Sequence, residues 1–442
     1  MELEIRMDGI KSGFTIIPSV RCTDKVRAEL RISVRNNTSK QISVKTIFYI
    51  NGPEGLKDTV LAVSNEITIA DSTQGFISEF FNTETYIGKR RITAEVLIDN
   101  NVCCESTQDL HIIHCETRAL PLIDVAWIEP WCYAFGKDGK ASTAEDVATY
   151  LNLLKSVGIH SAILAYSELI IYKIGAFYNS NIEEIKKFPA PVNFDFIEAF
   201  LNEADKLNMN VFVGLGRGDD LMLTWEGLDD AERIQKQIDF GAKLADELWN
   251  NYSHHKSFYG WYIAHEADDL PRAGRYYNPV ADILHSYAMD KPVLIAPSGT
   301  PIVDANTLNT AKYDIIAYQD AVGSGYMPYV NTWNQENRIA MLHSCYSRYM
   351  KAHFGTNKHI WTDLEIWKMD GPTYANAYAS PYHQVARQIE IERIYTDCIS
   401  CYAFPGMFQD ENASFKYLSK GAYELYEDYK AYFEKVRNIY EI

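Results

Sequence analysis

The segment FYGWYIAHEADD, residues 258–269, decides the fold, because an apolar run of strand length ends abruptly in polar and acidic residues. The run is rich in aromatic residues and too short for a buried helix, which favours a buried β-strand. Seven similar runs occur along the chain, and helical patterns separate them. The eight runs are LIDVAWI (122–128), HSAILAY (160–166), NVFVGLG (210–216), FYGWYIA (258–264), PVLIAP (292–297), DIIAYQ (314–319), HIWTDLE (359–365) and CISCYAF (398–404).

The segments between these runs carry apolar residues at every third or fourth position, for example at 144–158, 194–208 and 230–252. This spacing predicts amphipathic helices. Ser142 or Thr143 is expected to cap the first helix, and Gly158 to end it. Eight strands that alternate with helices, without a GxGxxG or Walker sequence, predict an α/β fold of the (β/α)8 or TIM barrel type over residues 117–442.

Residues 1–116 show a different, period-two pattern without helical stretches. Such alternation predicts half-buried strands, and turn residues such as Asn36 and Asn37 separate them. The chain therefore begins with an accessory all-β, immunoglobulin-like sandwich. The predicted strands are LRISVRN (30–36), SVKTIFYI (43–50), NEITIA (65–70), GFISEFF (75–81) and RRITAEVLI (90–98).

The overall composition excludes several classes of protein. The formal charge of -17 would repel a phosphate backbone, so nucleic acid is not an expected partner. Eight cysteines in 442 residues do not make a disulfide framework, and Cys103 and Cys104 are expected to point to opposite faces of a strand. No membrane span or signal peptide is read from the sequence, which predicts a cytoplasmic protein, or an exported one if Met1 replaces a removed signal.

The candidate site follows from the fold, because the active site of a barrel lies at the carboxyl ends of its strands. Glu266 follows the fourth run and Glu365 ends the seventh. Cleavage of a glycosidic bond needs one carboxylic acid to protonate the leaving oxygen and one carboxylate to attack the sugar or activate water. The other candidates at these ends are Glu129, Trp131, Glu168, Arg217, His265, Gln319, Asp320, Trp367 and Tyr402.

This arrangement resembles the large clan of retaining glycoside hydrolases that carry catalytic glutamates on strands four and seven. The segments at 260–269, 314–323 and 360–367 are also similar to a bacterial family of glycosidase-like barrels with an N-terminal β-sandwich. The resemblance implies that Glu266 is the acid/base, that Glu365 is the nucleophile and that the substrate is an oligo- or polysaccharide. His265 stands where the clan has an Asn that binds the sugar 2-hydroxyl, and it is expected to donate a similar bond or to tune Glu266.

The remaining rim residues have alternative roles. Glu129 and Trp131 are expected either to contact a sugar or to pack against the rim of the barrel. Glu168 is expected either to contact the substrate or to form a salt bridge with a neighbour such as Arg217. Gln319 and Asp320 bind hydroxyls or orient Glu365. Trp367 and Tyr402 complete the predicted substrate-binding set.

Two other functions stay open. One is a metal-assisted hydrolase or deacetylase that uses His265, Asp268 and Asp320, and the other is a carbohydrate-binding barrel without catalysis. Neither a cofactor nor a metal is expected, and His254 and His255 are expected at the surface, before the fourth strand. The accessory domain is expected to pack on the barrel rather than to bind sugar.

Overall fold

The computed structural model describes residues 8–51, 59–130, 143–218, 227–327, 332–369, 377–402, 407–408 and 419–442. The chain divides into two compact units. One comprises residues 1–120 with 284–292, and the other comprises residues 121–283 with 293–442.

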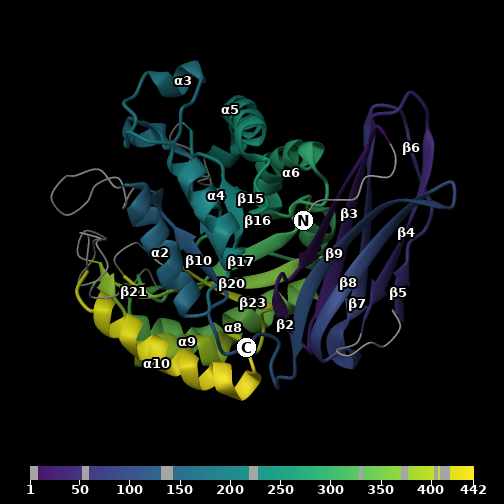
Figure 1. Ribbon diagram of the computed structural model, residues 1–442. Coiled ribbons are helices and arrows are strands. Elements are labelled where there is room, and N and C mark those ends of the chain that lie inside the picture. The colour runs from purple at the N-terminus through teal and green to yellow at the C-terminus, as the bar shows by residue number, and fades with distance from the viewer. Residues whose placement is uncertain are drawn as a thin grey trace. The chain divides into compact units, whose positions relative to one another are not determined.

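The second unit is a closed barrel of eight parallel strands in chain order (Figure 1). Each strand coincides with one of the eight predicted runs, so the predicted fold class is confirmed. Glu365 is the last residue of the seventh strand, and Glu266 follows the fourth. The strands are β10 (Val125–Ile128), β11 (Ser161–Leu164), β14 (Asn210–Gly214), β15 (Phe258–Ile263), β16 (Val293–Ile295), β17 (Ile315–Gln319), β20 (His359–Glu365) and β23 (Cys398–Tyr402).

Helices alternate with these strands. None among the described residues has the length and hydropathy that a membrane crossing requires. The helices are α2 (Ala144–Ser156), α3 (Glu183–Lys186), α4 (Phe196–Leu207), α5 (Ala231–Tyr252), α6 (Leu270–Tyr287), α7 (Ala305–Thr310), α8 (Gln335–His353), α9 (Tyr382–Glu392) and α10 (Ala422–Tyr440).

Helix α2 begins and ends where the sequence predicts. Thr143 caps it, because its hydroxyl accepts the backbone N–H of Asp146 while the Asp146 carboxylate accepts the N–H of Thr143. At the other end Gly158 has φ +82°, and the N–H groups of Gly158 and Ile159 donate to the carbonyls of Lys155 and Leu154. This pair of bonds is the Schellman motif that a left-handed glycine makes.

Replacing Gly158 by Ala is expected to destabilise the barrel for two reasons. A Cβ there would lie 2.2 Å from Cε2 of Phe433, and the left-handed backbone itself costs about 1–2 kcal/mol in a residue with a side chain. Gly355 is the matched control, because it has φ +77° and open space around its Cβ position. In urea unfolding, Gly158→Ala should lower the free energy of unfolding more than Gly355→Ala does. Equal losses would show that Phe433 moves away without cost.

The first unit contains two sheets that share one core. The three-stranded sheet consists of β1 (Ile10–Ile17), β3 (Arg27–Asn36) and β7 (Thr73–Asn82). Side chains from both sheets, including Phe14 and Phe48, meet in one cluster, which gives a sandwich as predicted. The second sheet comprises β2 (Arg21–Thr23), β9 (Asn101–Ile113), β8 (Gly88–Ile98), β4 (Ile42–Ile50), β5 (Thr59–Val63) and β6 (Ile67–Ile69).

The strand β9 differs from expectation in two ways. It is not among the five predicted strands, although it lies within the predicted all-β region, and its centre, ESTQD, has no apolar alternation. A bulge between β8 and β9 pairs Leu97 with Val102 and Val96 with Cys104, which leaves Cys103 as the extra residue. The expectation that Cys103 and Cys104 face opposite sides is therefore wrong, since their sulfurs lie 3.7 Å apart.

Three short hairpins in the loops after barrel strands were also missed. They are β12 (Glu168–Leu169) with β13 (Ile174–Ala176), β18 (Tyr326–Met327) with β19 (Thr332–Trp333), and β21 (Trp367–Lys368) with β22 (Tyr378–Ala379). Each follows the carboxyl end of a strand, so together they contribute to the end of the barrel where Glu266 and Glu365 lie.

Candidate active site

Glu365 lies at the end of β20 with its side chain buried under the loop that follows β17. The backbone N–H of Ser324 donates to Oε2 of Glu365 at 3.3 Å. A Cβ on Gly323 would lie 2.8 Å from the same oxygen and 2.5 Å from the carbonyl oxygen of Trp367. Only glycine at position 323 leaves room for the carboxyl group and the following strand.

Asp320 and Gln388 hold the backbone of Glu365 from both sides. Asp320 Oδ1 accepts the N–H of Glu365 at 3.3 Å and that of Val322 at 2.9 Å. Gln388 of α9 donates to the carbonyl of Glu365 at 3.1 Å and to Asp320 Oδ2 at 2.5 Å. Asp320 is fully buried, so of the two predicted roles the geometry fits the orienting one rather than contact with a hydroxyl.

The charge state of Glu365 is unusual. Burial, together with the charge of Asp320, raises the pKa of Glu365 to about 8, against the N–H groups of Ser324 and Gly323, which lower it. Burial also raises the pKa of Asp320, which hydrogen-bonds with Glu392, and the pKa of Asp363, which lies two residues before Glu365 on the same face of β20. Burial thus disfavours the ionised form of all three carboxyl groups around the end of the seventh strand.

Glu266 is the more exposed of the two glutamates. Its Oε1 accepts a hydrogen bond from Arg217 at 2.8 Å, and both side chains are about one quarter exposed. Burial alone would lower the pKa of Arg217, but the charges of Glu266 and of other groups, Glu129 among them, outweigh it and raise that pKa. Glu266, Arg217 and Glu129 therefore share one electrostatic environment at the barrel mouth.

His265 lies behind this ion pair. Its Nε2 is 2.9 Å from the carbonyl oxygen of Arg217, and its Nδ1 is 2.8 Å from the hydroxyl of Tyr276. Burial and the charge of Arg217 lower the pKa of His265 to about 4, so the ring is neutral, with Nε2–H donating and Nδ1 accepting. The expected bond from His265 to a sugar hydroxyl is not available in this geometry, because both nitrogens are engaged within the protein. His265 instead positions the loop that carries Arg217.

Glu168 joins the loops that follow the second and third strands. Its buried carboxyl accepts the N–H groups of Ile170 at 2.6 Å and Gly218 at 2.7 Å. Burial raises the pKa of Glu168 to about 7 in spite of these bonds. The expected salt bridge with the Arg217 side chain is replaced by these backbone bonds, and full burial removes Glu168 from direct contact with a substrate.

The other predicted residues are distributed around the mouth. The hydroxyl of Tyr402 donates to Glu129 Oε1, which links the eighth strand to the first. Gln319 is half-buried at the end of β17, and Trp367 is buried, with its ring beside Gly323. Trp131 lies outside the described residues.

Several residues of the site were missed from the sequence. Tyr172, which is exposed after the second strand, interacts electrostatically with Arg217. Gln384, Gln388 and Glu392 occur every fourth position of α9 and are buried with Val385 and Ile389. Polar residues at four-residue spacing on the apolar face of a helix were the signal that could have found Gln388 and Glu392.

The residues proposed for a metal-assisted hydrolase do not form a ligand set. The two nitrogens of His265 face the carbonyl of Arg217 and the hydroxyl of Tyr276 rather than a second ligand group. The Asp320 carboxylate accepts bonds from Val322, Glu365 and Gln388. Among the described residues, a group with converging ligand atoms is found elsewhere, at Glu198, His254 and His255.

Comparison with solved structures finds other barrels. A candidate alpha-L-fucosidase from Bacteroides thetaiotaomicron is 18% identical with a TM-score of 0.52, over 71% of this chain and 93% of that one. A glycoside hydrolase family 5 mannosidase from Rhizomucor miehei is 13% identical with a TM-score of 0.46, over 72% and 94% of the two chains. Beta-glucuronidase 2 from Bacteroides uniformis is 13% identical with a TM-score of 0.40, over 97% of this chain and 50% of that one. The first similarity supports the barrel fold alone, and the other two structures are less similar to this chain.

None of the curated protein sequences matches the chain. Residues 123–414, well over half of the chain, match the sequence model described as "Domain of unknown function (DUF4434)". These residues contain all the described strands of the barrel, together with Glu266 and Glu365. The chain therefore belongs to the DUF4434 family.

Proposed function

We propose that the protein is a retaining glycoside hydrolase in which Glu266 is the acid/base and Glu365 the nucleophile. The observation that carries the proposal is the fixation of Glu365 at the end of the seventh strand. Asp320 and Gln388 hold its backbone, and Gly323 and Ser324 surround its carboxyl group. A nucleophile needs such rigid placement, because small displacements of a reacting group cost large factors in rate.

The two carboxyl groups have different roles in the proposed reaction. Glu266 protonates the glycosidic oxygen while Glu365 attacks the anomeric carbon, which breaks the bond to the leaving alcohol and gives a glycosyl ester. Glu266 then takes a proton from water, which attacks the ester and frees Glu365 and the sugar. His265 and Arg217 position Glu266 for both steps.

The mouth offers groups that suit a sugar. Arg217 can donate to ring hydroxyls, and the linked pair of Glu129 and Tyr402 lies in the same electrostatic environment. Tyr172 is 61% exposed and provides a flat face for the C–H side of a pyranose. These groups favour an oligo- or polysaccharide substrate.

A panel of aryl glycosides and polysaccharides tests the proposed activity. We expect release of aglycone or reducing sugar from at least one member, with retention of anomeric configuration by NMR. Inversion would contradict the nucleophilic role of Glu365. Saturable binding of an oligosaccharide without any turnover would contradict the catalytic proposal and favour a carbohydrate-binding barrel.

The raised pKa of Glu365 predicts the pH dependence of this activity. A nucleophile must be ionised, so kcat/KM of the wild-type protein should rise with pH through about 8, the pKa of Glu365 in the free protein. Asp320→Asn removes a neighbouring negative charge while its amide oxygen can still accept the N–H groups of Val322 and Glu365. The pKa of Glu365 should fall, and the acidic limb should move to lower pH.

The matched control is Asp304→Asn, which changes an exposed aspartate that caps α7. It should leave the limb in place. An unshifted limb in Asp320→Asn would show that the charge of Asp320 does not act on Glu365.

A further inference from the structure

A cluster of two histidines and a glutamate lies at the opposite end of the barrel strands from the proposed active site. His254 and His255 precede the start of β15, whereas Glu266 follows its end. A strand of six residues separates the two ends by about 20 Å. The expectation that both histidines lie at the surface is wrong for His255, which is 5% exposed because Glu198 and Asp205 cover its two nitrogens.

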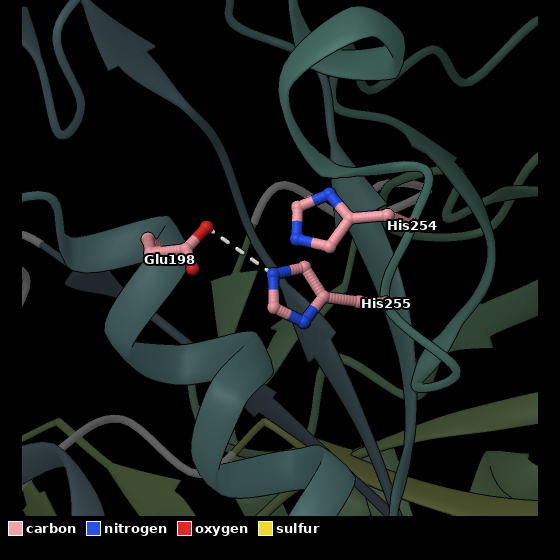
Figure 2. Close-up of side chains that lie close together, drawn as sticks. All are labelled: Glu198, His254 and His255. Carbon is pink, nitrogen blue, oxygen red and sulfur yellow. Dashed lines mark hydrogen bonds and ion pairs between the residues drawn. The ribbon is translucent and has the colours of Figure 1, made fainter.

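The side chains of Glu198, His254 and His255 converge. Figure 2 shows the two imidazole rings, from the loop before β15, beside the Glu198 carboxylate on α4. One ligand atom from each of the three residues lies within 4.8 Å of the others. Nε2 of His255 is 3.2 Å from Oε2 of Glu198. Two ligands bound to one tetrahedral zinc at about 2.0–2.1 Å would be separated by about 3.3 Å, which is close to this distance.

Two of the three side chains are already oriented by other groups. Nδ1 of His255 is 2.8 Å from Oδ2 of Asp205, whose other oxygen accepts the N–H of Ser257 at 2.7 Å. Asn202 donates to Oε1 of Glu198 at 2.8 Å, which leaves Oε2 directed at His255. A carboxylate on one imidazole nitrogen, with the other nitrogen directed at the ligand position, is the arrangement that orients metal-bound histidines.

We propose that Glu198, His254 and His255 bind a zinc ion, with Asp205 and Asn202 as orienting groups and water as the fourth ligand. Two imidazoles and a carboxylate are ligands that Zn²⁺ accepts in tetrahedral geometry. The ion replaces the proton between His255 and Glu198 and ties α4 to the loop that begins the fourth strand. It lies far from the two glutamates of the proposed active site, so the zinc site is independent of the proposed function.

Titration of tag-free, chelator-treated full-length protein with zinc chloride tests the site. Calorimetry should give one zinc ion per chain, and the melting temperature should rise with zinc. Co²⁺ should give the intense visible absorption of a tetrahedral complex. His254→Ala and Glu198→Gln change the exposed and half-exposed ligands and should each weaken zinc binding by at least tenfold. His343→Ala removes an exposed histidine on α8 and is the matched control, with unchanged binding.

The orienting carboxylate gives a second test. Asp205→Asn keeps the size of the side chain but weakens the hold on His255, and it should lower zinc affinity by about 10- to 100-fold. Absence of zinc binding by the wild-type protein, or equal binding by wild type, His254→Ala and Glu198→Gln, would overturn the proposal. Circular dichroism of each variant before titration excludes unfolding as the cause of a loss.

Discussion

Replacing Glu365 by Gln is expected to lower kcat by about 10⁴-fold or more on any glycoside that the protein cleaves. The change removes the proposed nucleophile and keeps its size, and loss of an enzymatic nucleophile acts on this scale. The amide oxygen can still accept the N–H of Ser324, so the fold should be kept. Initial rates on the best substrate of the panel measure the effect, and calorimetric binding of the same sugar should be unchanged.

The difference in stability between the wild type and Glu365→Gln should depend on pH in a defined direction. Burial raises the pKa of Glu365 to about 8 in the folded protein, above the ordinary value of 4.5. The folded state therefore binds the proton more tightly, and the wild type loses stability as pH rises from about 4.5 to about 8. Glu365→Gln lacks this loss and should be at least as stable as the wild type at alkaline pH. Glu232→Gln, on the exposed face of α5, is the control for both measurements and should change neither. A wild-type rate in Glu365→Gln would remove Glu365 from the mechanism.

Replacing Glu266 by Gln is expected to lower kcat by about 10²- to 10⁴-fold on substrates with poor leaving groups, because these need a proton from the acid/base. An aryl glycoside with an acidic phenol needs little protonation, so its first step should be nearly unaffected. A burst of phenol followed by slow turnover would then report the trapped glycosyl ester. Stopped-flow absorbance with a series of phenols of different pKa measures both effects.

This leaving-group series also decides between the two glutamates. A buried carboxyl group that keeps its proton to about pH 8 has the property of a general acid, which is the role proposed for Glu266 rather than Glu365. If the Glu365 variant keeps its rate on the most acidic phenols and the Glu266 variant does not, the roles are reversed. If both variants lose activity equally on all phenols, neither assignment holds.

The fold could be predicted from the sequence because the strands of a barrel are buried on both faces and appear as short apolar runs. HIWTDLE coincides with β20 at both ends, which fixed Glu365 on the seventh strand. The ends of α2 were readable for a similar reason, since Thr143 and Gly158 act on backbone groups within a few residues of themselves. Local chemistry of this kind is encoded in local sequence.

The side-chain contacts around the two glutamates could not be predicted in the same way. Asp320 and Gln388 meet at Glu365 from positions 68 residues apart, and no local pattern connects them. His265 was interpreted from its neighbour Glu266, but its partners are Tyr276 and the carbonyl of Arg217. Glu168 was interpreted as a rim acid, although the loops fold over it and bury it. Such contacts depend on how loops from different strands come together.

The three hairpins at the mouth have a consequence for how substrate preference could diverge among relatives. Among the described residues, each forms a two-stranded sheet of its own that is separate from the strand pairing of the barrel. A hairpin can therefore lengthen, shorten or be exchanged while the barrel beneath it keeps its register. We expect chimaeras that exchange β12–β13 between relatives, with Glu168 retained, to differ in the sugar they accept while their melting temperatures stay close to those of the parents.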